Sequence, residues 1–114
     1  MKPSTAKVKG RETEAAFVRF LRSHGVPHAE RRRLTGSADQ GDITGWPGVC
    51  VEIKSGATLA IPKWLAECDA ETANAHADIG VVVVRPKGKP DPHDWFAVVR
   101  TGTLMQLMAE AGRT

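Results

Sequence analysis

The sequence predicts an α/β protein in which helices flank one mixed β-sheet. Three observations predict this class. Residues 10–24 and 61–76 have helical periodicity, residues 49–54 alternate as a strand does, and residues 79–84 form a continuous apolar run typical of a buried strand. The second helical segment stands between these two strands, so the unit predicts a right-handed crossover joining parallel strands. With 114 residues, the chain is expected to form one domain around one hydrophobic core.

The other elements are assigned in chain order. In the first helix, Phe17, Phe20 and Leu21 share a face, and Gly25 with Pro27 ends the helix. Short strands are expected at 31–35 and 42–44, and the turn cluster at 45–48 predicts a hairpin between 42–44 and 49–54. A fifth strand is expected at 95–99 and a closing helix at 103–111, with Met105 and Met108 on its packed face. Residues 1–9 are expected to be a flexible basic arm, and residues 10–114 the single domain.

Composition narrows the possible function classes. Hydrophobic residues make up 41% and charged residues 25%, which is typical of a soluble globular protein, and no apolar run predicts a membrane span or a secretory signal. The net charge of +3 permits a nucleic-acid partner without requiring one. Two cysteines are too few for a disulfide scaffold or a four-cysteine zinc site, so we expect a reducing, cytoplasmic setting.

Two carboxylates are expected to face each other in the predicted hairpin. If the hairpin turns at Pro47, Asp42 lies opposite Glu52, with Cβ atoms about 4.5–5.5 Å apart. Lys54 shares the face of Glu52 because side chains alternate along a strand. Opposed like charges destabilise a sheet, and a divalent cation such as Mg²⁺, which prefers oxygen ligands, would relieve the repulsion. The arrangement depends on the register, since a slip of one residue would turn Asp42 to the other face.

Other acidic residues are candidates for the same site. On the first helix Glu14 borders the apolar stripe and is able to turn toward the sheet, whereas Glu12 lies among arginines. Asp39, three residues before Asp42, is either an accessory ligand or a polar loop residue. On the second helix, Lys63, Glu67 and Glu71 stand four residues apart, which favours a solvated row of ion pairs over a role near a metal.

Several basic residues are candidate contacts for nucleic-acid phosphates. On a strand, Arg31 and Arg33 would share one face and Arg32 would take the other. Each cation also has an ordinary alternative as a solvated or helix-pairing side chain. The candidate DNA-binding set is Arg11, Arg31, Arg32, Arg33, Lys63, Lys87 and Lys89.

At these residues the chain resembles the PD-(D/E)XK nuclease superfamily. Asp42, Glu52 and Lys54 match its D…EXK signature, and Glu14, after Lys9-Gly10-Arg11, looks like its first-helix glutamate. Gly41 stands where the signature has proline. The resemblance covers roughly residues 9–100 and is greatest to the small Holliday junction resolvases of archaea and phages.

The resemblance implies an αβββαβ restriction-endonuclease-like core and Mg²⁺-dependent hydrolysis of DNA phosphodiester bonds, which leaves a 5′-phosphate and a 3′-hydroxyl. Asp42, Glu52, the Ile53 carbonyl and Glu14 would hold Mg²⁺, with Mn²⁺ as a substitute, while Lys54 would orient water or stabilise the developing charge. Branched DNA is the expected partner, in recombination or repair in the cytoplasm of a bacterial or phage-infected cell. Symmetric cutting of a junction implies a homodimer. The alternatives are a repair or replication nuclease acting on flaps, nicks or ends, a catalytically silent DNA-binding module on the same fold, and an unrelated α/β protein.

Overall fold

The computed structural model describes residues 5–33, 38–56 and 58–114 of the chain. Its elements follow one another in the order α1 (Thr5–Ser23), β1 (Glu30–Arg31), β2 (Ile43–Thr44), β3 (Val49–Ser55), α2 (Ile61–Asn74), β4 (Ile79–Arg85), a 3-10 turn η1 (Pro92–Asp94), β5 (Phe96–Val98) and α3 (Thr101–Glu110).

The predicted α/β class and the mixed sheet are confirmed. Strand β3 pairs in parallel with β4, and β4 pairs antiparallel with β5, so α2 is the connection between two parallel strands. In the described part of the chain the five strands do not form one sheet. Strands β1 and β2 instead make a separate two-stranded antiparallel sheet.

The predicted hairpin between 42–44 and 49–54 forms only in part. Within the described ranges, β2 has its ladder with β1 and none with β3. A single backbone hydrogen bond, from Asp42 N to Val51 O at 2.8 Å, joins the segment 42–44 to β3. The Asp42 carbonyl accepts from Arg32 N at 2.9 Å, so the residue bridges β3 and the β1 segment. This leaves Asp42 beside Glu52 without a regular hairpin.

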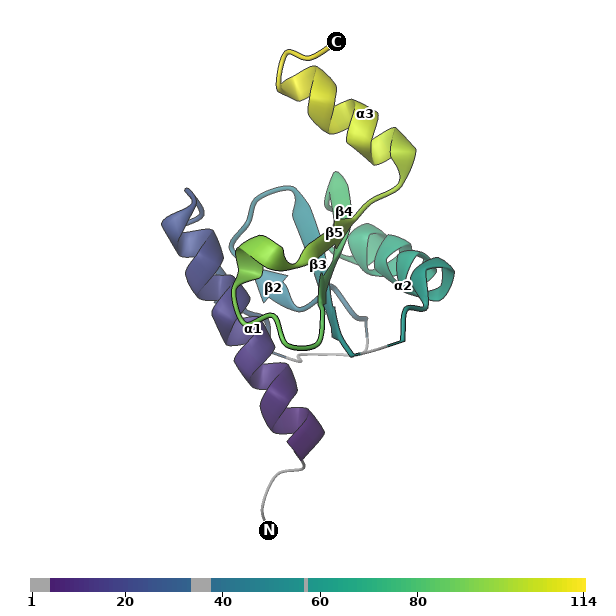
Figure 1. The fold of residues 1–114 in the computed structure, drawn as a ribbon. Helices are drawn as coiled ribbons and strands as arrows, with labels where there is room; N and C mark the ends of the chain where they lie inside the picture. The colour runs from purple at the N-terminus through teal and green to yellow at the C-terminus, as the bar shows by residue number, and fades with distance from the viewer. Residues whose placement is uncertain (1–4, 34–37, 57) are drawn as a thin grey trace.

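The three-stranded sheet is covered on both faces, by α1 on one side and α2 on the other (Figure 1). Val51, Val81 and Val83 belong to the core cluster that includes Phe17 and Leu21 of α1. The alternate residues of β4, Val82 and Val84, instead pack with Cys68 on α2 in a second cluster. Cys50 and Glu52, which face α2 from β3, are therefore buried rather than facing water.

Two terminal predictions differ from the structure. Helix α1 begins at Thr5, so residues 5–9 of the expected flexible arm are helical, and residues 1–4 lie outside the described residues. The prediction that Met105 and Met108 lie on a packed face of α3 is wrong, because the two residues are 57% and 37% exposed. The helix leaves the end of β5 and projects away from both faces of the sheet (Figure 1), so its apolar residues have no layer to cover.

No helix in the described ranges is long and apolar enough to cross a membrane.

A tight turn at Gly41 brings Asp42 against β3. Gly41 has φ of +92°, and a Cβ placed there would lie 2.8 Å from Val51 O and 2.9 Å from Cys50 Sγ. Only glycine adopts this conformation and this contact without strain. Proline, the residue at the matching position of the D…EXK signature, has φ near −65° and would not fit this turn.

We predict that Gly41→Ala destabilises the fold more than Gly88→Ala does. Gly88 has a similar φ of +77° but open space around its Cα, so its substitution measures backbone strain alone. The additional clash at Gly41 should lower the free energy of unfolding by a further 1–3 kcal/mol or so, about the cost of overpacking. Urea denaturation measures both variants, and equal losses would show that the Gly41 turn does not press on β3.

Candidate functional site

Asp42 is held against the backbone of β3 by its own side chain. Its Oδ2 accepts a hydrogen bond of 2.7 Å from Ile53 N, so the carboxyl lies beside Glu52. Burial, followed by the negative charges of Glu52 and Glu14, raises the pKa of Asp42 to about 7, although the bond from Ile53 N opposes this. The predicted neighbourhood of Asp42 and Glu52 is therefore present.

Glu52 lies between β3 and α2 and is only 8% exposed. Its Oε1 is 3.5 Å from Lys54 Nζ, whereas Oε2 is buried and has no hydrogen-bond partner among the described residues. Burying a carboxylate oxygen without a hydrogen-bond partner is unfavourable in free energy. A proton, an ordered water or a cation bound to this oxygen would relieve that cost.

Lys54 lies between two carboxylates. Its Nζ is 3.0 Å from Glu67 Oε2 on α2, in addition to the contact with Glu52. Burial lowers the pKa of Lys54, but the hydrogen bond and charge of Glu67 and the charge of Glu52 outweigh it, so the pKa lies above its ordinary value. Lys54 is therefore a fixed, protonated ammonium group.

Glu14, on α1, is already paired with the side chain of Arg31. Arg31 donates from Nε to Glu14 Oε1 at 3.0 Å, and its Nη2 lies 2.9 Å from the same oxygen. Glu14 is partly buried, Glu12 is exposed as expected, and the charge of Glu14 contributes to the raised pKa of Asp42. The structure thus brings together Asp42, Glu52 and Lys54, whereas Glu14 pairs with Arg31 and belongs to no cluster of three acidic side chains in the described part of the chain.

The predicted solvated row of ion pairs is wrong for Glu71, which is buried, although Lys63 and Glu67 of the same row do pair at 4.0 Å. Glu71 is 6% exposed, and its Oε2 is buried without a partner in the described part of the chain. Burial, followed by Glu52 and then Asp39, raises the pKa of Glu71 to about 10. The sequence carried a signal for this: Glu71 stands three residues after the buried Cys68, on the side of α2 that faces the sheet.

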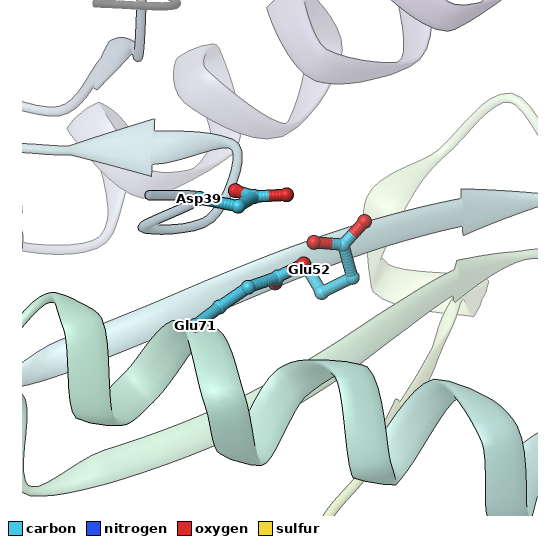
Figure 2. A group of neighbouring side chains, drawn as sticks. All are labelled: Asp39, Glu52 and Glu71. Carbon is cyan, nitrogen blue, oxygen red and sulfur yellow. The ribbon is translucent and has the colours of Figure 1, made fainter. Parts of the chain in front are cut away.

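Asp39, Glu52 and Glu71 form a cluster that could hold a metal ion. One carboxylate oxygen from each lies within 4.8 Å of the others, and they come from a loop, a strand and a helix (Figure 2). Asp39 is exposed, whereas the other two residues are buried. Carboxylate oxygens are the ligands that Mg²⁺ and Ca²⁺ prefer.

The expected phosphate contacts are spread over several surfaces. Arg31 is engaged by Glu14, and Arg32 donates from Nη1 to Gln40 Oε1 at 3.0 Å, so these two serve the local fold. Arg31 and Arg32 do differ in exposure as an alternating strand predicts, although β1 itself ends at Arg31. The remaining candidates are exposed: Arg11, Arg33, Lys63, Lys87 and Lys89.

An open groove of about 340 Å³ lies at the carboxyl ends of β3 and β4. Its lining includes Ser55, which follows Lys54, as well as Arg85 and Lys87. Arg85 was not among the residues singled out from the sequence. Its guanidinium donates to Thr13 Oγ1 at 3.1 Å and lies 5.6 Å from the ring centroid of Trp95, which fixes its position.

The raised pKa of Asp42 makes stability depend on pH. Its folded pKa of about 7 exceeds the unfolded value of 3.8, so the folded state binds the proton more tightly. The stabilising contribution is complete below pH 3.8 and is lost as the pH rises to about 7.

We therefore predict that, in chelator, the wild type loses more stability between about pH 5 and 8 than Asp42→Asn does, by on the order of 2 kcal/mol. Asparagine still accepts from Ile53 N but does not ionise. Urea denaturation at both pH values gives the difference, and parallel losses in the two proteins would contradict the raised pKa.

The chemistry available in this region is that of clustered carboxylates with one fixed ammonium group, that of Lys54, beside them. Comparison of the chain with protein-family models, with curated proteins and with solved structures found no match.

Proposed function

We propose that the protein is a Mg²⁺-dependent DNA endonuclease, with the Holliday junction as its leading substrate. The observation that carries this proposal is the convergence of Asp42, Glu52 and Lys54, in which Glu52 keeps one buried oxygen without a partner among the described residues. The resemblance of these residues to the D…EXK signature names the reaction, and the geometry is compatible with it.

The donor set fits a hard cation. Asp42, Glu52 and the Ile53 carbonyl would hold Mg²⁺, which when bound polarises a phosphoryl oxygen and lowers the pKa of water. Glu14 would join them only where its second oxygen is available, because Arg31 binds Oε1. Mn²⁺ has similar oxygen preferences and would substitute.

Lys54 provides fixed positive charge at this site. Glu67 and Glu52 hold its Nζ in place and keep it protonated, so it is suited to orient a water molecule or to stabilise charge that develops on the phosphate. A protonated lysine does not act as a general base, so in this proposal its role is electrostatic.

The DNA would approach over the groove at the carboxyl ends of β3 and β4. Arg85 and Lys87 line this groove, and Ser55 connects it to Lys54. Positive side chains near the reacting phosphate favour a polyanion although the net charge of the chain is only +3. The exposed cations named above would contact the DNA backbone further from the site.

We predict Mg²⁺-dependent cleavage of DNA that is reduced about 10²- to 10³-fold in Lys54→Ala and Glu52→Gln. The assay uses a labelled four-way junction, a flap, a duplex and a single strand, each with Mg²⁺ and with chelator. Arg19→Ala removes one exposed charge on α1, outside the proposed site, and should retain wild-type rates.

The products distinguish the possible functions. Paired, symmetric nicks across the junction support the resolvase, whereas cutting confined to flaps or ends indicates the repair or replication nuclease. DNA binding without cleavage in Mg²⁺ or Mn²⁺ would refute the nuclease and leave the silent binding module.

Symmetric cutting of a junction also requires two active sites, so the proposal includes a homodimer. We predict a mass of about twice 12.3 kDa by light scattering of the junction-cutting form. A monomer that still makes paired nicks would separate the activity from the dimer.

A further inference from the structure

We propose that Asp39, Glu52 and Glu71 form a cation site of their own, on the α2 side of β3, which binds a hard divalent ion of the size of Ca²⁺. Its occupancy requires no nucleic acid, so it goes beyond the proposed nuclease reaction.

Three separate elements supply the site. Asp39 lies in the loop before β2, Glu52 on β3 and Glu71 on α2, and their carboxylates converge (Figure 2). One oxygen from each lies within 4.8 Å of the others. Ligands on opposite sides of Ca²⁺ are about 4.6–5.2 Å apart, because Ca–O distances are 2.3–2.6 Å. The three oxygens therefore need no large movement to bind such an ion.

A second observation points to a ligand at this place. Glu52 Oε2 and Glu71 Oε2 are buried atoms with no hydrogen-bond partner in the described ranges, and both residues are more than nine-tenths buried. An acidic cluster on a surface leaves its oxygens to water, whereas these two oxygens are withdrawn from it. A cation would satisfy both at once.

The surrounding contacts hold Asp39 near α2. Asn74 Nδ2 donates to the Asp39 carbonyl at 2.8 Å, which ties the loop to the end of the helix. Gly41 N donates to Asp39 Oδ1 at 2.9 Å and orients the carboxylate. Among the described residues neither Asp39 nor Glu71 has an ion-pair partner, so no cationic side chain neutralises this side of Glu52.

The competing explanation is one proton shared between Glu52 and Glu71. Such a pair would also relieve the repulsion, but it would not need Asp39 and would not respond to a metal ion. The role of Asp39 and direct measurement of ion binding therefore separate the two explanations.

The test is calorimetric titration of the full chain with Ca²⁺ near neutral pH, without DNA. We expect wild-type binding to weaken by about 10- to 100-fold or more in Glu71→Gln and in Asp39→Asn. Asp69→Asn is the matched control, because Asp69 is an exposed acidic residue of α2 that pairs with Arg100 at 2.7 Å. It should bind Ca²⁺ as the wild type does.

Asp42→Asn separates this site from the one proposed for Mg²⁺ and should retain a Ca²⁺ site that depends on Glu71. Circular dichroism checks each fold. If Glu71→Gln does not fold, Asp39→Asn, which changes an exposed loop residue, still decides the question.

Ca²⁺ binding that is unchanged in both Glu71→Gln and Asp39→Asn, or absent from the wild type, would overturn the proposal. The cleavage assay tests the nuclease proposal separately, and its result does not depend on Ca²⁺ binding by Asp39 and Glu71. A protein that cuts no DNA but loses Ca²⁺ binding in these two variants would still support this site.

Discussion

The burial of Glu52 between a sheet and a helix is the constraint on which the rest of the site depends. A carboxylate withdrawn from water is unfavourable unless its charge is balanced and its oxygens are bonded. Lys54 meets this requirement for one oxygen only, at 3.5 Å, and the neighbouring carboxyl groups of Asp42 and Glu71 make it harder to meet. Asp42 and Glu71 both carry raised pKa values, and in both cases Glu52 is among the causes. The carboxyl groups around Glu52 therefore favour a bound proton, and would favour a bound cation, because the neighbouring side chains alone do not offset their charge.

Helix α2 has two opposite effects on this balance. Glu67 binds Lys54 at 3.0 Å, which fixes the ammonium group beside Glu52. Glu71, one turn further along, adds a carboxylate on the other side without any compensating cation in the described part of the chain. A helix that only covered the sheet would present apolar residues at this position, as it does at Cys68. A buried Glu71 is thus less favourable for packing than an apolar residue would be. This unfavourable burial is the physical argument for a ligand at the site.

Much of the fold could be predicted from the sequence, because the signals were local. The alternation of β3, the apolar run of β4 and the periodicity of α1 each depend on neighbouring residues, and each is confirmed. The separation of β1 and β2 from the main sheet could not be predicted, since it depends on the turn at Gly41 and on contacts between distant segments. The exposure of α3 also follows from where the chain leaves β5, which residue periodicity does not report.

The candidate site was only partly predictable for the same reason. The neighbourhood of Asp42 and Glu52 was predicted by pairing the two residues across a turn. In the described part of the chain no ladder joins β2 to β3, and the Asp42 side chain is instead held by its hydrogen bond from Ile53 N. Glu71 was missed because spacing along α2 favoured ion pairs with Lys63 and Glu67, whereas tertiary packing turned it toward β3. Its three-residue spacing from the buried Cys68 is the signal that would have placed Glu71 on the side of α2 that faces the sheet.

Glu52 is common to both proposed cation sites, and this couples them. Its Oε1 faces Lys54, and its Oε2 has no described partner. A cation bound on the Asp42 side would reduce the negative charge that attracts a second cation on the Glu71 side, because both interact with the same carboxylate. By reciprocity, an ion held by Asp39 and Glu71 would weaken ion binding at Asp42 by the same factor. Occupancy near Glu71 would therefore act on the proposed reaction without any contact with DNA, through the charge that Glu52 shares.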